Sequence, residues 1–383
     1  MKPTLEIPPL PSSQSSVDVA APVRPEVHRK PVVSNFRSLT LHRWCVWVSA
    51  FLVFAMLALM VCLRYGTQVI ELPRIFNILV QAMTAVSQGG SGEDPTHVIL
   101  LQVRLPRLLL AFLVGASLAA VGVSLQALLR NPLADPFVLG ISSGAALGAA
   151  IALLFGVGVS MWSLSALPMC AFLGAIISLL IIYRIAATQY GFSIYTLLLA
   201  GVVLSAVLMA LITFLTSVAD PNRVFGMLAW LMGSLTGPDY PTLGILAVYL
   251  GIGLLILGSQ AQSLNVLTLG EEAARSLGVE VERVKKLVFF ATALVTGAVV
   301  AFSGLIGFVG LIVPHAVRLA LGADHRLLLP IAGLTGGIFL MVADTVARTL
   351  FSPAEIPVGV VTAIVGGPVF LYLLMNRRAQ VVT

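Results

Sequence analysis

The sequence predicts an all-α integral membrane protein with ten transmembrane helices and with both termini on the cytoplasmic side. Hydrophobic residues make up 58% of the 383 residues and charged residues only 10%, and the mean hydropathy is +1.03. These apolar residues form long runs of membrane-spanning length, which excludes a soluble domain. The period-2 alternation of a membrane β-barrel is absent, so the spans must be helices that pair their own backbone groups.

Ten apolar runs account for the predicted helices. They cover residues 44–63, 105–129, 137–158, 163–183, 194–218, 241–258, 287–302, 303–321, 327–347 and 356–375. The stretch 287–321 fits either one overlong helix or two short ones. Both tails of the chain are basic, which places both termini in the cytoplasm by the positive-inside rule and requires an even number of spans. We therefore predict a break near Ser303-Gly304.

The segments outside these runs differ in composition. Residues 1–41 are rich in Pro, Ser, Val and Arg and are predicted to form a disordered cytoplasmic tail. A cleavable signal peptide is not expected, because the first apolar run begins only near Trp44 and does not end in a small-residue cleavage site. The membrane domain is predicted over residues 42–378, followed by a short tail at 379–383.

A polar segment separates the sixth and seventh apolar runs. Eight of the sixteen residues from Glu271 to Lys286 are charged. Such a helix-prone segment between two spans must lie in water, either against a partner protein or as a solvated connector.

The sequence predicts no catalytic residue and no metal site. A nucleotide-binding P-loop needs a glycine-rich turn that ends in Lys-Ser/Thr, and none of the four lysines follows a glycine. The HExxH motif is absent, and the three cysteines have neither metal-site nor disulfide spacing. Basic residues lie at the ends of the spans, which gives no indication of a nucleic-acid partner.

Charged residues inside the predicted spans are few and costly. Asp344 and Arg348 are four residues apart on one predicted helix and are expected to pair on one face. An ion-coupled secondary transporter would need carboxylates near the middle of the bilayer. Because Asp344 lies near the end of its span, this alternative is disfavoured but stays open.

Three segments carry a family resemblance. They are RLPRLLLAFLVGASLAAVGVSLQALLRNPLADPFVLGISSGAALG (104–148), LNVLTLGEEAARSLGV (264–279) and SGLIGFVGLIVPHAVRLALGADHRLLLP (303–330), and ADTVART and EIPVGVVTAIVGGPVFLYLL follow. The chain resembles the permease subunit of type II ABC importers, which take up ferric siderophores, haem and cobalamin. The resemblance covers about residues 42–378.

This resemblance implies a transport subunit of the bacterial inner membrane that is not itself an enzyme. It implies a homodimer of permeases in membrane lipid, two cytoplasmic ATPase subunits that carry ATP and Mg, and a periplasmic substrate-binding protein. No cofactor is expected on this chain.

The resemblance also implies roles for particular residues. The ATPase-coupling helices would lie at about residues 264–286 and include Leu269, Gly270, Glu271, Glu272, Ala274, Arg275, Leu277 and Gly278. Arg104, Arg107 and Arg348 would meet carboxylates of the binding protein. The alternative for each arginine is contact with lipid phosphates at the interface.

The cytoplasmic gate implied by the resemblance includes Asn131, Leu133, Ser193 and Ile194. Relatives often carry small hydroxyl residues where Ile194 and Tyr195 stand here, and Asn131 with Pro132 also fits a simple helix stop. Arg223 is expected at the outer mouth, next to Phe225, Met227 and Trp230. Such a site would suit a haem, which has two propionates and a flat apolar ring. We therefore predict haem as substrate, with a ferric siderophore or cobalamin as alternatives.

Overall fold

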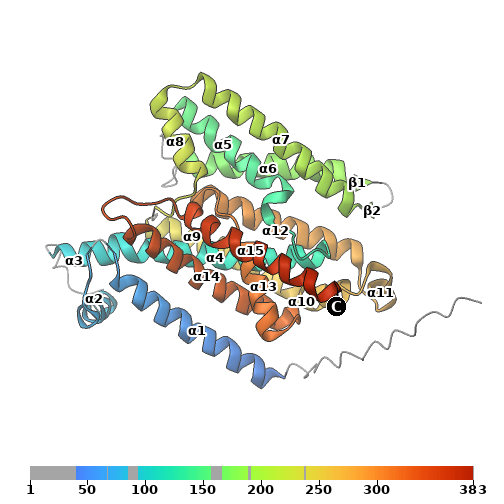
Figure 1. The fold of residues 1–383 in the computed structure, drawn as a ribbon, viewed down its shortest axis with the longest axis horizontal. Coiled ribbons are helices and arrows are strands. Elements are labelled where there is room, and N and C mark those ends of the chain that lie inside the picture. The colour runs from blue at the N-terminus through green and yellow to red at the C-terminus, as the bar shows by residue number, and fades with distance from the viewer. Residues whose placement is uncertain are drawn as a thin grey trace, which may run out of the picture. The chain divides into compact units, whose positions relative to one another are not determined.

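The fold is seen in a computed structural model that describes residues 40–66, 68–84, 94–156, 166–188, 191–236 and 239–382. Over these residues the chain is almost entirely helical (Figure 1). The predicted disordered tail lies outside the described residues, apart from Thr40 and Leu41.

Each of the ten apolar runs forms a helix. These helices are α1 (Leu41–Arg64), α4 (Leu105–Leu128), α5 (Ile141–Phe155), α6 (Ala166–Ala186), α7 (Ile194–Val218), α9 (Tyr240–Ser259), α12 (Val281–Ser303), α13 (Val309–Leu321), α14 (His325–Thr349) and α15 (Val358–Val382). Among the residues that the structure describes, seven segments are long and apolar enough to cross a membrane, whereas α5, α13 and the apolar part of α15 (Val358–Tyr372) are shorter. The number of ten spans and the side of the termini stay predictions.

Short elements connect these helices. They are α2 (Leu72–Thr84), α3 (Pro95–Val98), the π-helical turn η2 (Ile99–Arg104), the 3-10 turn η3 (Pro136–Leu139), the antiparallel pair β1 (Ala187–Thr188) and β2 (Gly191–Phe192), α8 (Pro221–Leu231), α10 (Ala261–Leu267) and α11 (Glu271–Ser276). The predicted helix 137–158 begins only at Ile141, because Asp135 caps η3 and Gly140 then takes a positive φ of 75°.

Burial separates central helices from peripheral ones. The most apolar window of the segment Pro95–Leu128 is 83% buried, and those of α12 and α14 are 72% buried. The corresponding windows of α1, α6 and α7 are only 22–28% buried, although their mean hydropathy (2.3–2.7) is similar to or higher than that of the central helices (1.9–2.4). Large apolar side chains on α7, such as Leu199 (67% exposed) and Phe214 (61%), face outward. Outward-facing residues of this kind meet lipid or another subunit in a membrane protein.

The central helices approach each other through small residues. A Cβ atom added to Gly115 of α4 would overlap the backbone carbonyl of Gly336 on α14, and one added to Gly122 would overlap that of Gly310 on α13. Lipid tails are as apolar as the helix surfaces, so helices in a bilayer associate largely by this close packing. The α4–α14 contact therefore requires glycine at position 115, and the α4–α13 contact requires it at position 122.

The predicted break in the stretch 287–321 lies where the sequence placed it. Helix α12 ends at Ser303, Gly304 has a φ of 64°, and α13 begins at Val309. The amide of Ser234 donates a hydrogen bond of 2.9 Å to the Ser303 carbonyl, which satisfies one acceptor at the end of α12. The break joins the end of α12 to the segment that follows α8.

Candidate functional site

The coupling segment predicted at about residues 264–286 contains the end of α10, the whole of α11 and the beginning of α12. Gly270 (φ 118°) and Gly278 (φ 83°) flank α11 in conformations that favour glycine. Ala274 is fully buried, whereas Leu269 and Leu277 are 69% and 64% exposed. The segment therefore packs inward through Ala274 and presents two large apolar side chains outward.

Charged residues lie close to these two leucines along the chain. Glu272 and Arg275 are exposed, and Arg275 lies 3.7 Å from Glu271 one helical turn away. Exposed leucines within a charged surface are typical of a protein–protein contact, where an apolar centre is surrounded by polar groups. Figure 1 shows α11 at the edge of the bundle, next to α12.

Helix α10 is anchored to the beginning of α14. Asn265 of α10 donates to Asp324 at 2.8 Å and accepts from the backbone amide of His325 at 2.8 Å. Asp324 also binds the side chain of Arg326 at 2.7 Å. Partial burial raises the pKa of Asp324, but hydrogen bonds from Arg326 and Asn265 outweigh this and lower the pKa to about 2. The carboxylate therefore stays ionised and holds α10 at this end of the bundle.

Behind α11 lies a buried lysine that was not among the predicted site residues. Lys285 of α12 is 3% exposed, and its Nζ lies 3.2 Å from Glu271 and 2.7 Å from Glu282. The sequence contains one signal for this cluster, the i,i+3 spacing of Glu282 and Lys285 at the start of an apolar helix. The contact to Glu271, fourteen residues away, depends on the tertiary fold.

The arginines predicted to dock a binding protein lie at the opposite end of the bundle, where α4 begins and α14 ends. Asp344 is fully buried and accepts from Arg107 Nε at 3.0 Å and from Arg348 Nε at 2.9 Å. The predicted i,i+4 pair of Asp344 and Arg348 is therefore confirmed. Arg107 also reaches Glu355 at 2.9 Å, whose side chain is 49% exposed. Two guanidinium groups and two carboxylates thus balance each other at this end.

Arg104, the third of these arginines, has a different environment. It is 3% exposed, and its guanidinium donates to the backbone carbonyls of Leu63, Arg64 and Gln68. In this conformation it closes the loop after α1. The docking role of the three arginines stays a prediction, and here their guanidinium groups bind acceptors within the chain.

The predicted gate residues lie on two segments that both contact α7 or lead into it. The side chain of Asn131 accepts from the backbone amide of Leu133 at 2.9 Å, and both residues are exposed in the loop after α4. Ser193 precedes α7 and accepts from the Thr196 amide at 3.3 Å. The loop after α4 reaches α7 through η3, because a Cβ atom added to Gly201 would lie 2.8 Å from the Val138 carbonyl.

The residues expected at the outer mouth do not form one cluster. Arg223 lies on α8 with 43% of its side chain exposed, 3.7 Å from Asp220. Phe225 is 73% exposed, whereas Met227 is 1% exposed and packs in the core with Ala146, Ala150 and Ile212. Trp230 packs against the same core. The expectation that Met227 and Trp230 flank a ligand together with Phe225 is therefore wrong, because α8 uses that face to bind α5 and α7.

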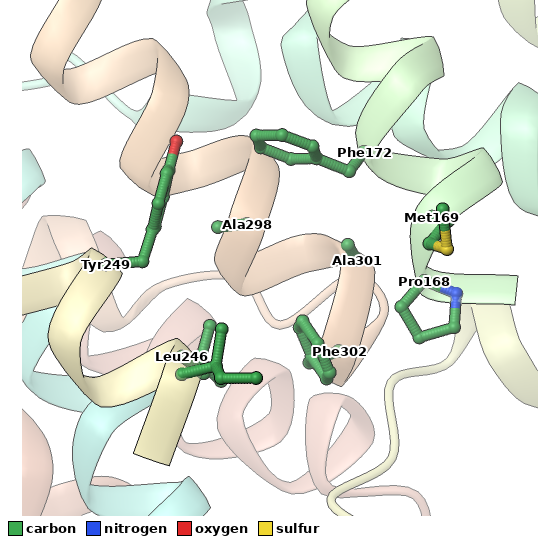
Figure 2. A pocket seen from close by; sticks show the side chains of 9 residues that line it. Pro168, Met169, Phe172, Leu246, Tyr249, Ala298, Ala301 and Phe302 are labelled. Carbon is green, nitrogen blue, oxygen red and sulfur yellow. The ribbon is translucent and has the colours of Figure 1, made fainter. Parts of the chain in front are cut away.

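An apolar cavity of about 200 Å³ lies between α6, α9 and α12. Its lining is shown in Figure 2, where Phe172, Tyr249 and Phe302 project toward the space between the helices. The rings of Phe172 and Tyr249 meet edge to face with 5.8 Å between their centroids. The nine described residues that line this cavity are all uncharged, so the cavity does not suit an anionic metal chelate.

Comparison with known proteins agrees with these features. Residues 52–376 match the FecCD transport family. The chain is 45% identical over 294 residues to the hemin transport system permease protein HmuU of Yersinia pestis, which covers 76% of this chain and 87% of that protein. It is 44% identical over 302 residues to the cobalamin import system permease protein BtuC of Halobacterium salinarum, which covers 79% and 80%.

A solved structure shares the fold. A metal-chelate type ABC transporter in an inward-facing conformation superimposes with a TM-score of 0.72 at 32% sequence identity, and the match covers 87% of this chain and 99% of that one.

Proposed function

The chain belongs to the FecCD transport family and is a permease subunit of a type II ABC importer, and from that premise we propose that it imports haem. In this proposal two copies of the chain form the pathway across the inner membrane. Two ATPase subunits bind ATP and Mg on the cytoplasmic side, and a periplasmic protein delivers the substrate. The chain itself binds no cofactor and has no catalytic residue.

The exposed leucines of the coupling segment carry the ATPase proposal. Leu269 and Leu277 are large, apolar and more than 60% exposed, on a segment that is too polar to lie in lipid. A cleft in a soluble subunit that covers these side chains would remove their apolar surface from water, which stabilises association by about 25 cal/mol for each Å² buried. Glu272 and Arg275 would then fix the orientation of the docked subunit.

Arg223 and Phe225 of α8 carry the substrate proposal. An exposed guanidinium can pair with a propionate, and an exposed aromatic ring can cover part of a flat macrocycle. The relatives named for haem and for cobalamin are equally similar to this chain. The residues of α8, and not overall similarity, therefore support the choice of haem.

We propose that Arg107 and Arg348 dock the binding protein and that Arg107 exchanges its outer partner on docking. The Arg107 guanidinium is shared between buried Asp344 and half-exposed Glu355. A carboxylate of the binding protein could replace Glu355 without exposing Asp344. Docking would then leave the buried pair intact, as buried ion pairs are costly to break.

The test is ATP hydrolysis by this permease in liposomes with its ATPase, with and without haem-loaded binding protein. We expect stimulation by haem, a weaker response in Arg223→Gln, and no change in Arg74→Gln, whose side chain pairs with Asp94 at 2.8 Å. Stimulation only by a siderophore-loaded or cobalamin-loaded protein would keep the mechanism and replace the substrate. Uptake without any ATPase would indicate an ion-coupled carrier and overturn the proposal.

A further inference from the structure

A buried ion cluster links the coupling helix to the segment that precedes α7. Lys285 is the centre of this cluster, and all three of its ammonium protons have acceptors in reach. They are Glu271 of α11 at 3.2 Å, Glu282 of α12 at 2.7 Å, and the backbone carbonyl of Phe192 in β2 at 3.0 Å. Arg275 lies at 3.7 Å from Glu271 and 3.9 Å from Glu282, so two cations face two carboxylates.

The two charged residues of α12 hold both backbone groups of Phe192. Lys285 donates to the Phe192 carbonyl, and Glu282 accepts from the Phe192 amide at 2.8 Å. These side chains occupy the positions that a neighbouring strand would take at the edge of β2. Phe192 is thereby held against α12 by two hydrogen bonds, one from a cationic side chain and one to an anionic side chain.

Phe192 in turn fixes the start of α7. Its side chain is 2% exposed and packs against Phe289 of α12, with 5.2 Å between the ring centroids. The next residue, Ser193, caps α7 through the amide of Thr196. A shift of Phe192 must therefore move Ser193 and Ile194, the residues of the proposed gate.

We infer that Lys285 is a positioning residue that transmits movement of the coupling helix α11 to the gate at the start of α7. Glu271 connects Lys285 to α11, and Glu282 and Phe192 connect it to the gate. The side chains of Glu271 and Glu282 are 26% and 38% exposed, so a protein seated on α11 can act on this cluster directly. The inference rests on the proposed function, because it gives a path for a signal from an ATPase.

The first measurement uses the permease alone and tests the link itself. Hydrogen exchange is followed at the Phe192 amide in the wild type, in Lys285→Met and in Lys286→Met. Lys286 is the matched control, because it is the next residue of α12 and is exposed. We expect exchange about tenfold faster in Lys285→Met, because the variant loses the hydrogen bond from the Lys285 ammonium to the Phe192 carbonyl, which helps to hold this backbone segment against α12. No change is expected in the control. Equal exchange in all three proteins would overturn the inference.

The second measurement tests coupling in liposomes with the ATPase and haem-loaded binding protein. We expect Lys285→Met to hydrolyse ATP within about twofold of the wild type but to move about tenfold less haem for each ATP. Glu271→Gln weakens only the connection between Lys285 and α11. It should lower the amount of haem transported for each ATP without faster exchange at the Phe192 amide. The double variant should be no worse than Lys285→Met, because both changes break one path.

The outcomes separate this inference from the function on which it rests. If Lys285→Met and Glu271→Gln both transport haem at the wild-type ratio, the positioning role is wrong while the importer stands. If the wild type shows no ATP-driven uptake of any metal chelate, the proposed function fails and the transmission role fails with it. Lys286→Met must match the wild type in both measurements, and a similar loss there would also count against a specific role of Lys285.

Discussion

Replacing Asp344 with asparagine should destabilise the end of the bundle at which α4 begins and α14 ends. Asp344 is fully buried and accepts from Arg107 at 3.0 Å and from Arg348 at 2.9 Å. The substitution keeps the size of the side chain but removes the negative charge between two guanidinium groups. The Arg348 side chain is only 7% exposed, so its charge would remain buried without its carboxylate.

The magnitude follows from the cost of leaving a buried charge uncompensated. Removing one member of a buried ion pair costs about 3–5 kcal/mol. Arg107 keeps Glu355 as a partner, so we take the lower half of this range, about 3–4 kcal/mol. Since each 1.4 kcal/mol corresponds to a factor of ten, the population of the locally opened state should rise by at least about a hundredfold.

The chain contains its own reporter of this opening. The thiol of Cys62 on α1 is 3% exposed and lies beside Thr345, the residue after Asp344. In a background with Cys45→Ser and Cys170→Ser, a maleimide dye in detergent micelles would modify Cys62 only when this end of the bundle opens. Under conditions where closing is faster than labelling, the labelling rate should rise by the same factor of at least about a hundred.

Glu355→Gln is the matched control. It removes the outer partner of Arg107, which is 49% exposed, and exposed ion pairs contribute only about 0–1 kcal/mol. Its labelling rate should change less than about fivefold. If Asp344→Asn labels no faster than Glu355→Gln, the claim that Asp344 compensates the guanidinium groups of Arg107 and Arg348 is refuted.

Three further predictions follow from the fold and the coupling segment. Leu269→Glu with Leu277→Glu should leave the melting temperature of the permease unchanged, because both side chains are exposed, but should abolish its co-purification with the ATPase; full retention of the ATPase would refute the docking role. Burial raises the pKa of Asp135 to about 6, so the folded state binds a proton more tightly than the unfolded chain, and the contribution of this side chain to stability falls as the pH rises from about 4 to 6. The variant Asp135→Asn can still cap η3 and should therefore have a higher melting temperature than the wild type at pH 7.5. This difference should vanish below pH 4. Gly115→Val should lower the melting temperature strongly because its side chain would overlap the Gly336 carbonyl, whereas Gly244→Val on α9, where a Cβ atom meets open space, should have little effect.

Features that depend on local sequence were predictable. The helix α7 begins and ends at the residues expected from its apolar run, because Ser193 supplies the N-cap and the run is uninterrupted. The break after Ser303 and the pair of Asp344 with Arg348 follow from a glycine at a helix end and from i,i+4 spacing. In each case the deciding residues are neighbours along the chain.

Features that depend on tertiary contacts were not predictable. The sequence places Met227 beside Arg223 on α8 but does not reveal that α5 and α7 cover that face. The acceptors of Arg104 are carbonyls about forty residues earlier, and carbonyls carry no sequence signal. Lys285 and Glu271 meet only because α11 folds back onto α12. A charged residue on an apolar helix indicates that a partner exists, and only the fold identifies it.

The pairing of Arg107 and Arg348 with Asp344 has a consequence for synthesis of the chain. Arg107 enters the membrane with α4, but its partner Asp344 follows 237 residues later. At about 5–20 residues per second, the ribosome needs roughly 12 to 47 s to deliver that partner. Arg107 is the third residue of α4, so during this interval its long side chain can reach the lipid headgroups while the rest of the helix is inserted. Because this arginine lies in the first turn of α4, the helix can be inserted into the membrane before α14 has been synthesised.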